Sequence, residues 1–178
     1  MKYLTVFLIK GDAGKFQRKI LCELAKRFDI GEAIRRDPPP HITLKYSFET
    51  ENIKEIEQLL KNFCKKQKPT SLNLDGFGHF GKNVIFIKIN PSKEMRIMHK
   101  SLILEFHKIS WMRWHEHDRS NFNFHASVAH TDITTKFDEI WRYIQKYHPK
   151  YELMWDNITL FKLIDGKWKI HKTFHILN

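Results

Sequence analysis

The stretch PHITLKYSF, residues 40–48, decides the expected fold and is the first indication of a site. A run of prolines ends at Pro40, and a strand-like segment begins with a histidine directly after it. Because side chains alternate along a strand, His41 and Thr43 share one face, while Ile42 and Leu44 share the other. The stretch therefore predicts a strand with one polar face and one buried face.

A second stretch, FHASVAHT at residues 124–131, repeats this layout of imidazole, apolar residue and hydroxyl. His125 and Ser127 occupy the positions that His41 and Thr43 occupy in the first stretch. His130 has the opposite strand parity, so we expect it to leave the shared face unless the strand bends or ends. We therefore assign His130 a structural role or a place at the rim.

Elements of the same kind recur in the same order around the two stretches. Each half runs strand, helix, long connection, histidine strand, helix and strand, which predicts an α+β chain of two similar lobes that arose by duplication. We expect one domain, residues 1–178, with a pseudo-twofold axis between its lobes. The expected strands are 3–9, 41–48, 71–77, 83–89 and 124–130, and the helices are 13–28, 52–66, 91–108 and 134–147. Residues 76–81 are expected to form a hairpin turn, and the strand-rich end, 151–177, to turn at 165–167.

Two lobes related in this way can bring both histidine strands to one central cleft. One neutral imidazole can then take a proton from a nucleophile, while one protonated imidazole gives a proton to a leaving oxygen. The hydroxyls of Thr43 and Ser127 can hydrogen-bond the oxygens of a phosphate where charge accumulates. This arrangement suits cleavage of a phosphodiester without a metal ion.

The paired motifs HITLKYSF and HASVAH resemble the HxTx motifs of the 2H phosphoesterase superfamily, whose 2′-5′ RNA ligase-like branch includes RNA 2′,3′-cyclic phosphodiesterases. The resemblance implies a bilobal α+β fold with two antiparallel sheets lining a central cleft and helices outside. It implies metal-independent hydrolysis of a terminal 2′,3′-cyclic phosphate, often to a 2′-phosphate, without a cofactor or metal site. The catalytic pairs would be His41 with Thr43 and His125 with Ser127; by analogy His41 is the acid and His125 the base. Ser127 departs from the commoner threonine, which keeps the hydroxyl but loses the stiffness of a β-branched side chain.

Four further residues are candidates for substrate binding. Lys45 lies two positions beyond Thr43 and could contact phosphate, although an exposed lysine without this role is an equal alternative. Tyr46 could stack on a base, as could Trp114, while Arg113 could pair with phosphate. The last two belong to the segment 111–122, which could instead only cover the junction of the lobes. His115 and His117 in that segment lack the spacing of a zinc site.

The composition favours an anionic partner. The chain has 31 Lys and Arg against 20 Asp and Glu, a formal net charge of +11, which favours a polyanionic partner such as nucleic acid or an acidic membrane surface. Of these partners, the resemblance implies RNA or a small cyclic nucleotide. Two isolated cysteines predict reduced thiols, and no apolar run reaches the length of a membrane span. We expect a cytoplasmic protein that is a monomer, with neither a membrane nor an obligatory protein partner.

Two other functions use the same features. A basic RNA-binding module without significant catalysis would also need a positively charged cleft. A 2′-5′ phosphodiesterase or an RNA-end ligase would use similar phosphate chemistry, although the sequence has no nucleotide-binding lysine motif for ATP-driven ligation.

Overall fold

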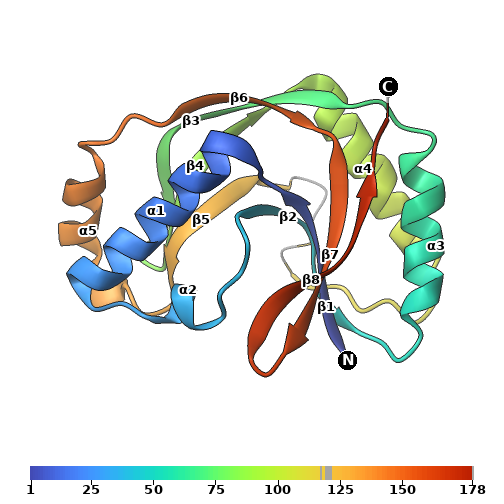
Figure 1. Cartoon of the computed structure of the whole chain (residues 1–178), viewed down its shortest axis with the longest axis horizontal. Coiled ribbons are helices and arrows are strands. Elements are labelled where there is room, and N and C mark those ends of the chain that lie inside the picture. Colours follow the sequence, from blue (N-terminus) through green and yellow to red (C-terminus); the bar gives the residue numbers. More distant parts are fainter. Residues whose placement is uncertain (117, 119–121, 178) are drawn as a thin grey trace.

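Two four-stranded antiparallel sheets form the centre of the chain, as Figure 1 shows. The computed structural model describes residues 1–116, 118 and 122–177. The first sheet has the strand order β2-β1-β7-β8, and the second has the order β5-β4-β3-β6. The strands are β1 (Lys2–Leu8), β2 (His41–Glu49), β3 (Thr70–Phe80), β4 (Val84–Pro91), β5 (His125–His130), β6 (Lys150–Trp155), β7 (Asn157–Ile164) and β8 (Lys167–His175).

The helices lie mainly on the outer sides of these sheets (Figure 1). They are α1 (Gly11–Phe28), α2 (Glu32–Arg35), α3 (Ile53–Cys64), α4 (Lys93–His107) and α5 (Phe137–Ile144), and a 3₁₀ turn, Thr134–Lys136, precedes α5. The expected α+β fold with two sheets is therefore confirmed, and the four expected long helices are all present. The short helix α2 was not expected, because it lies inside the proline-rich connection.

Each histidine strand is an edge strand of its sheet and lies beside the strand that opens its half of the chain. β2 pairs with β1, and β5 pairs with β4. The helices cross over between the halves: α1 follows β1 but packs on β5 of the other sheet. In the reverse direction, His99 of α4 donates from Nε2 to the backbone oxygen of Leu44 in β2, over 2.8 Å.

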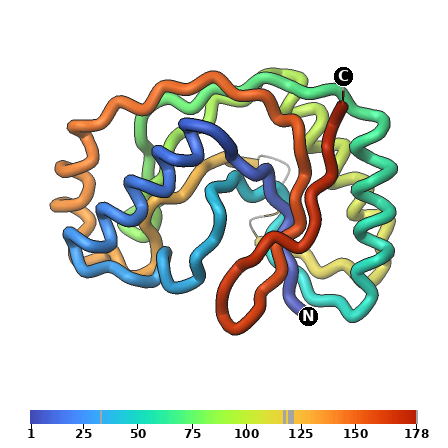
Figure 2. The backbone as a smooth tube through the Cα atoms, in the orientation of Figure 1, coloured from blue at the N-terminus to red at the C-terminus, as the bar shows by residue number. Residues whose placement is uncertain are grey.

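The two ends of the chain meet in the first sheet, where β1 pairs with β7 (Figure 2). The fully buried side chain of Asn157, at the start of β7, continues this pairing. Its Oδ1 accepts from the backbone N–H of Leu8, and its Nδ2 donates to the backbone oxygen of Leu8, both over 3.1 Å. Because Leu8 is the register partner of His41, Asn157 fixes the end of the sheet that carries the first motif.

Two turns show how glycine is used. The C-terminal hairpin turns at Asp165 and Gly166, which both have positive φ, as a two-residue type I′ turn requires. The expected turn over 76–81 is wrong in extent, because β3 continues to Phe80. Gly76 has a φ of +67° at a register shift within β3, and only Gly81, with a φ of +53°, lies in the turn itself.

Cys64 is buried and Cys22 is partly buried, and both are free thiols. Among the described residues, no helix is long and apolar enough to cross a membrane.

Candidate active site

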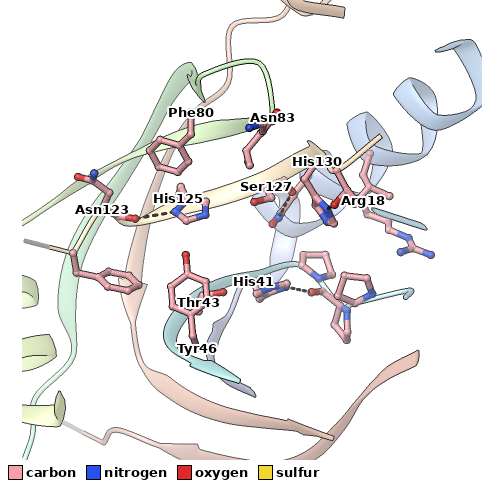
Figure 3. Close-up of a pocket in the computed structure, with 18 residues that line it drawn as sticks. Arg18, His41, Thr43, Tyr46, Phe80, Asn83, Asn123, His125, Ser127 and His130 are labelled. Carbon is pink, nitrogen blue, oxygen red and sulfur yellow. Dashed lines mark hydrogen bonds between the residues drawn. The ribbon is translucent and has the colours of Figure 1, made fainter. Parts of the chain in front are cut away.

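A cleft of about 1000 Å³ lies between the two histidine strands, and Figure 3 shows the side chains that line it. All four predicted catalytic residues line this cleft, and they come from β2 and β5. The cleft is completed by α1, by the proline run before β2 and by the ends of β3 and β4. The other lining residues are Gln17, Arg18, Leu21, Pro38, Pro39, Pro40, Tyr46, Phe80, Asn83, Val84, Phe122, Asn123, His130 and Thr131.

The imidazoles of His41 and His125 are held in the same way. Nδ1 of His41 lies 2.7 Å from the backbone oxygen of Pro39, and Nδ1 of His125 lies 2.8 Å from that of Asn123 (Figure 3). A carbonyl oxygen can only accept, so Nδ1 carries the proton in each ring. In the neutral form of each ring, Nε2 is therefore the proton acceptor, which is the arrangement that a general base needs.

The surroundings of His41 favour its neutral form. The pKa of His41 is lowered to about 4, chiefly because the ring is buried; the hydrogen bond to Pro39 opposes this shift, and the nearby imidazoles of His125 and His130 add to it. Taking a charged imidazole out of water is unfavourable, and neighbouring positive charge adds to that cost. His41 is therefore a neutral acceptor at neutral pH in the unliganded protein.

The hydroxyl residues lie beside the imidazoles on the same faces. Thr43 of β2 and Ser127 of β5 both line the cleft and are partly buried. The backbone oxygen of Ser127 accepts from Nε2 of Gln17 over 3.1 Å, so α1 fixes this strand at the motif. Gln17 itself is buried, and its Oε1 has no hydrogen-bond partner in the described part of the chain.

A β-bulge follows the hydroxyl residue in both histidine strands. In β2, Thr43 pairs with Val6 and Lys45 pairs with Thr5, so Leu44 is the extra residue. In β5 the register shifts in the same way between Ser127 and Ala129. Each bulge reverses the alternation of side chains beyond it.

The bulges change which residues enter the cleft. His130 lines the cleft, so the expectation that it leaves the shared face is wrong. Tyr46, at the equivalent place in β2, also lines the cleft, as Figure 3 shows. A signal for the second bulge is present in the sequence, because the consecutive apolar residues Val128 and Ala129 break the alternation and are both buried.

Lys45 does not have the position that was expected for a phosphate ligand. The bulge turns it into the protein, where its side chain is fully buried and pairs with Asp118 over 2.7 Å. Asp118 also accepts from the backbone N–H groups of Tyr46 and His115, both over 2.9 Å. The pair therefore joins the segment after α4 to the bulge of β2, and the predicted contact of Lys45 with substrate is wrong for this structure.

Arg113 and Trp114 are exposed and do not line the cleft. The backbone oxygen of Arg113 accepts from Nζ of Lys45, and the ring of Trp114 stacks on His107 with centroids 3.8 Å apart. Their segment therefore covers the junction beside β2, while its last residue, Phe122, and the following Asn123 line the cleft. His117 lies outside the described residues, and the part of the chain that is described contains no group of three metal-ligating side chains.

Aromatic side chains surround His125. The ring of Phe80 meets it edge-on with centroids 5.0 Å apart, and Phe86 lies 5.3 Å away. Gly78 makes room for Phe86, because a Cβ at this position would lie 2.6 Å from its ring. These aromatic residues were not predicted as part of the site.

Comparisons with known proteins identify the family of this chain. The family model of the 2'-5' RNA ligase superfamily matches residues 21–167. A relative from Bacillus mycoides, named "Putative phosphoesterase", is 27% identical over 158 residues, which cover 86% of each chain. A relative of the same name from a Geobacillus species is 26% identical over 159 residues, 84% of this chain and 83% of its own.

Solved structures show the same fold. A crystal structure titled as a phosphoesterase has a TM-score of 0.65 at 14% identity, covering 99% of this chain and 98% of its own. Escherichia coli LigT in complex with 3'-AMP has a TM-score of 0.62 at 15% identity, with the same coverage.

The chain belongs to the 2'-5' RNA ligase superfamily, and the resemblance that its paired motifs predicted is confirmed.

Proposed function

We propose that this protein is a metal-independent cyclic phosphodiesterase that hydrolyses a terminal RNA 2′,3′-cyclic phosphate, leaving a 2′-phosphate. The observation that supports it most strongly is the matched setting of His41 and His125, whose Nδ1 atoms both lie against a backbone carbonyl two residues earlier. Membership of the superfamily and the formal charge of +11 agree with a nucleotide or RNA substrate.

In the proposed reaction, a water oxygen forms a bond to phosphorus while the bond from phosphorus to the 3′-oxygen breaks. One imidazole takes a proton from the water, and the other gives a proton to the leaving 3′-oxygen. Thr43 and Ser127 hydrogen-bond the phosphate oxygens that do not take part in bond breaking. The products are a 2′-phosphate and a 3′-hydroxyl, so no redox or cofactor step is needed.

The family analogy implies one assignment of these roles, and we adopt it. Nδ1 of His125 carries its proton, so Nε2 of His125 can accept the proton of water, and His41 gives a proton to the leaving 3′-oxygen. Burial lowers the pKa of His41 in the free protein, so His41 takes up its proton when the anionic phosphate binds beside it and raises that pKa.

The first test is hydrolysis of an RNA oligonucleotide with a 2′,3′-cyclic phosphate end, in the presence of EDTA. We expect His41→Ala and His125→Ala each to lower kcat by about 10²–10⁴-fold, the usual contribution of one positioned proton transfer. His148→Ala, which removes an exposed histidine outside the cleft, is the matched control and should retain full activity. The position of the product phosphate is read by comparison with 2′- and 3′-phosphorylated standards.

Four outcomes would contradict the proposal. Hydrolysis that EDTA abolishes would require a metal ion, and hydrolysis that survives both alanine variants would place the chemistry elsewhere. A folded wild-type protein that binds RNA in a salt-dependent way without turnover would favour the RNA-binding module instead. Activity confined to 2′-5′ linkages or to RNA-end joining would support the remaining alternatives.

A further inference from the structure

The cleft has two chemically different ends, on opposite sides of the paired histidines (Figure 3). The end beside His125 is aromatic and includes Phe80, Tyr46 and Phe122. The end beside His41 is polar and includes His130 and Arg18. A pseudo-twofold cleft with different ends can hold an unsymmetrical substrate in only one direction.

The aromatic end is suited to a nucleobase. Phe80 is 37% exposed although it is a large apolar residue, so part of it is accessible to a ligand. Tyr46 lies across the cleft, where its ring stacks against His115 with centroids 5.1 Å apart. The exposed Asn123 beside them can hydrogen-bond a base edge. Stacking of a base on aromatic rings, with a few polar contacts to its edge, is the usual way in which proteins hold an unpaired base.

His130 differs from the other two cleft imidazoles in the partner of its Nδ1. That atom lies 2.8 Å from the hydroxyl of Thr131, and a hydroxyl can donate as well as accept. His130 can therefore carry its proton on Nε2 even when it is neutral, and Nε2–H can donate to an anionic oxygen. His41 and His125 cannot do this while neutral, because their Nδ1 atoms face carbonyl oxygens.

The backbone that presents His130 is strained. Thr131 has a φ of +73°, which is rare for a β-branched residue. Such strain persists only where surrounding contacts enforce it, and it is concentrated at functional sites. Here the backbone N–H of Thr131 donates to the backbone oxygen of Asn83 over 3.2 Å, so a cleft residue in the turn just before β4 holds the strained backbone.

Arg18 supplies positive charge at the same end, and its side chain is 39% exposed. It pairs with Asp37 over 2.5 Å through one terminal nitrogen, while a guanidinium has five N–H donors in all. The other carboxylates near His130 have donors of their own: Asp132 accepts from two backbone N–H groups of residues 31 and 32, and Glu32 pairs with Arg35. The end can therefore accept an anion without displacing these contacts.

We infer that the cleft binds a nucleotide in one direction, with its base beside Phe80 and Tyr46 and its 5′-phosphate beside His130 and Arg18. The inference rests on the proposed function, because it takes the cyclic phosphate to lie between His41 and His125. On a ribose, the base is attached to C1′, next to C2′, and the 5′-oxygen is attached through C4′, next to C3′. The two groups therefore lie beyond opposite ends of the 2′,3′-cyclic phosphate. The two ends of the cleft match these two groups, so the preferred substrate carries a 5′-phosphate or a preceding nucleotide.

Two small substrates test this direction without the charge of a long RNA. They are adenosine 2′,3′-cyclic phosphate and the same compound with a 5′-phosphate. We expect the 5′-phosphorylated compound to have the higher kcat/KM by about tenfold, the contribution of one charge-assisted hydrogen bond. In Arg18→Ala and His130→Ala this ratio should fall towards one. Phe80→Ala should raise KM for both compounds and keep the ratio, and Arg96→Ala, which removes an exposed charge on α4 outside the cleft, should keep it as well.

The outcomes separate this inference from the proposed function. The inference would be overturned if the wild type had equal kcat/KM values for the two compounds. It would also be overturned if Arg18→Ala and His130→Ala both kept the ratio of the wild type. In either case the proposed hydrolysis would stand. A ratio that depends on Phe80 and not on Arg18 would reverse the direction of binding. If neither compound is hydrolysed, the assay with the RNA oligonucleotide decides the proposed function. The ratio of Kd values, measured by calorimetry on the wild type and the same variants, then decides the direction alone.

Discussion

Among the described residues, three histidines line the cleft, and their hydrogen bonds separate them into two kinds. His41 and His125 each place Nδ1 against a carbonyl oxygen, so each neutral ring accepts through Nε2. His130 places Nδ1 against a hydroxyl, so its neutral ring can donate through Nε2. The sequence identified the first two by their spacing from a hydroxyl residue, whereas the partner of Nδ1 depends on backbone geometry that no local pattern encodes.

The pH dependence of catalysis tests the role of His41. If His41 is the acid, loss of its proton abolishes activity, and its lowered pKa places that loss near pH 4 in the free protein. We therefore expect kcat/KM, which reports the free enzyme, to be higher at about pH 5 than at about pH 8. A kcat/KM that rises steadily over this range would contradict the assignment of His41 as the acid.

A stability control belongs with this profile. Burial lowers the pKa of His41, His99 and His130 in the folded state. The unfolded chain therefore binds more protons below about pH 6.5, and the free energy of unfolding falls as the pH decreases through this range. Samples held at each acidic pH and then assayed at pH 7 distinguish reversible protonation from unfolding.

At the scale of the element, the two β-bulges decide which side chains form the site. Periodicity predicted the long helices and the paired strands well, because each buries one stripe or one face. It failed beyond Thr43 and Ser127, where one extra residue reverses the alternation. Lys45 was consequently expected in the cleft and His130 outside it. In the structure, Lys45 is buried inside the protein and His130 lines the cleft.

The buried pair of Lys45 and Asp118 stabilises the bulge in β2. Both side chains are fully buried, and Asp118 also accepts from the backbone N–H of Tyr46. We expect Lys45→Met to lower the free energy of unfolding by about 3–5 kcal/mol, because it leaves a buried carboxylate without its cation. Urea unfolding measures the effect, and the double variant Lys45→Met/Asp118→Asn should recover part of the loss.

The exposed pair of Lys82 and Asp138 provides the comparison, with side chains 56% and 71% exposed. Lys82→Met should change the free energy of unfolding by less than about 1 kcal/mol, as is usual for surface pairs. Equal effects of the two substitutions would show that Lys45 does not hold the bulge through Asp118.

At the scale of the whole molecule, the repeated order of elements in the sequence predicted two similar lobes. It did not predict that α1 packs on β5 of the other sheet, or that the C-terminal hairpin completes the sheet of β1. Such pairings join residues far apart in the chain, and hydrophobic periodicity contains no information about which partner a strand will choose. The bilobal arrangement could thus be inferred, whereas the exchange between the halves could not.

Asn157 tests the importance of this long-range junction. Replacing it with leucine removes the partners of both backbone groups of Leu8. We expect Asn157→Leu to lower the free energy of unfolding by about 2–4 kcal/mol, since buried polar groups left unpaired are costly. It should also lower the activity, because Leu8 is paired with His41. Asn157→Asp, which keeps one acceptor, should be less severe in urea unfolding; equal stability of the wild type and the leucine variant would contradict this role.

The pairing of β1 with β7 also fixes an order of events during synthesis. The first strand of the protein has a ladder partner that begins at Asn157, near the opposite end of the chain. While the ribosome is still adding residues, β1 has one unsatisfied edge, and the sheet that carries His41 remains incomplete. The nascent chain can assemble the sheet of β3 to β6 first, and the sheet that carries His41 is complete only when β7 and β8 have left the exit tunnel.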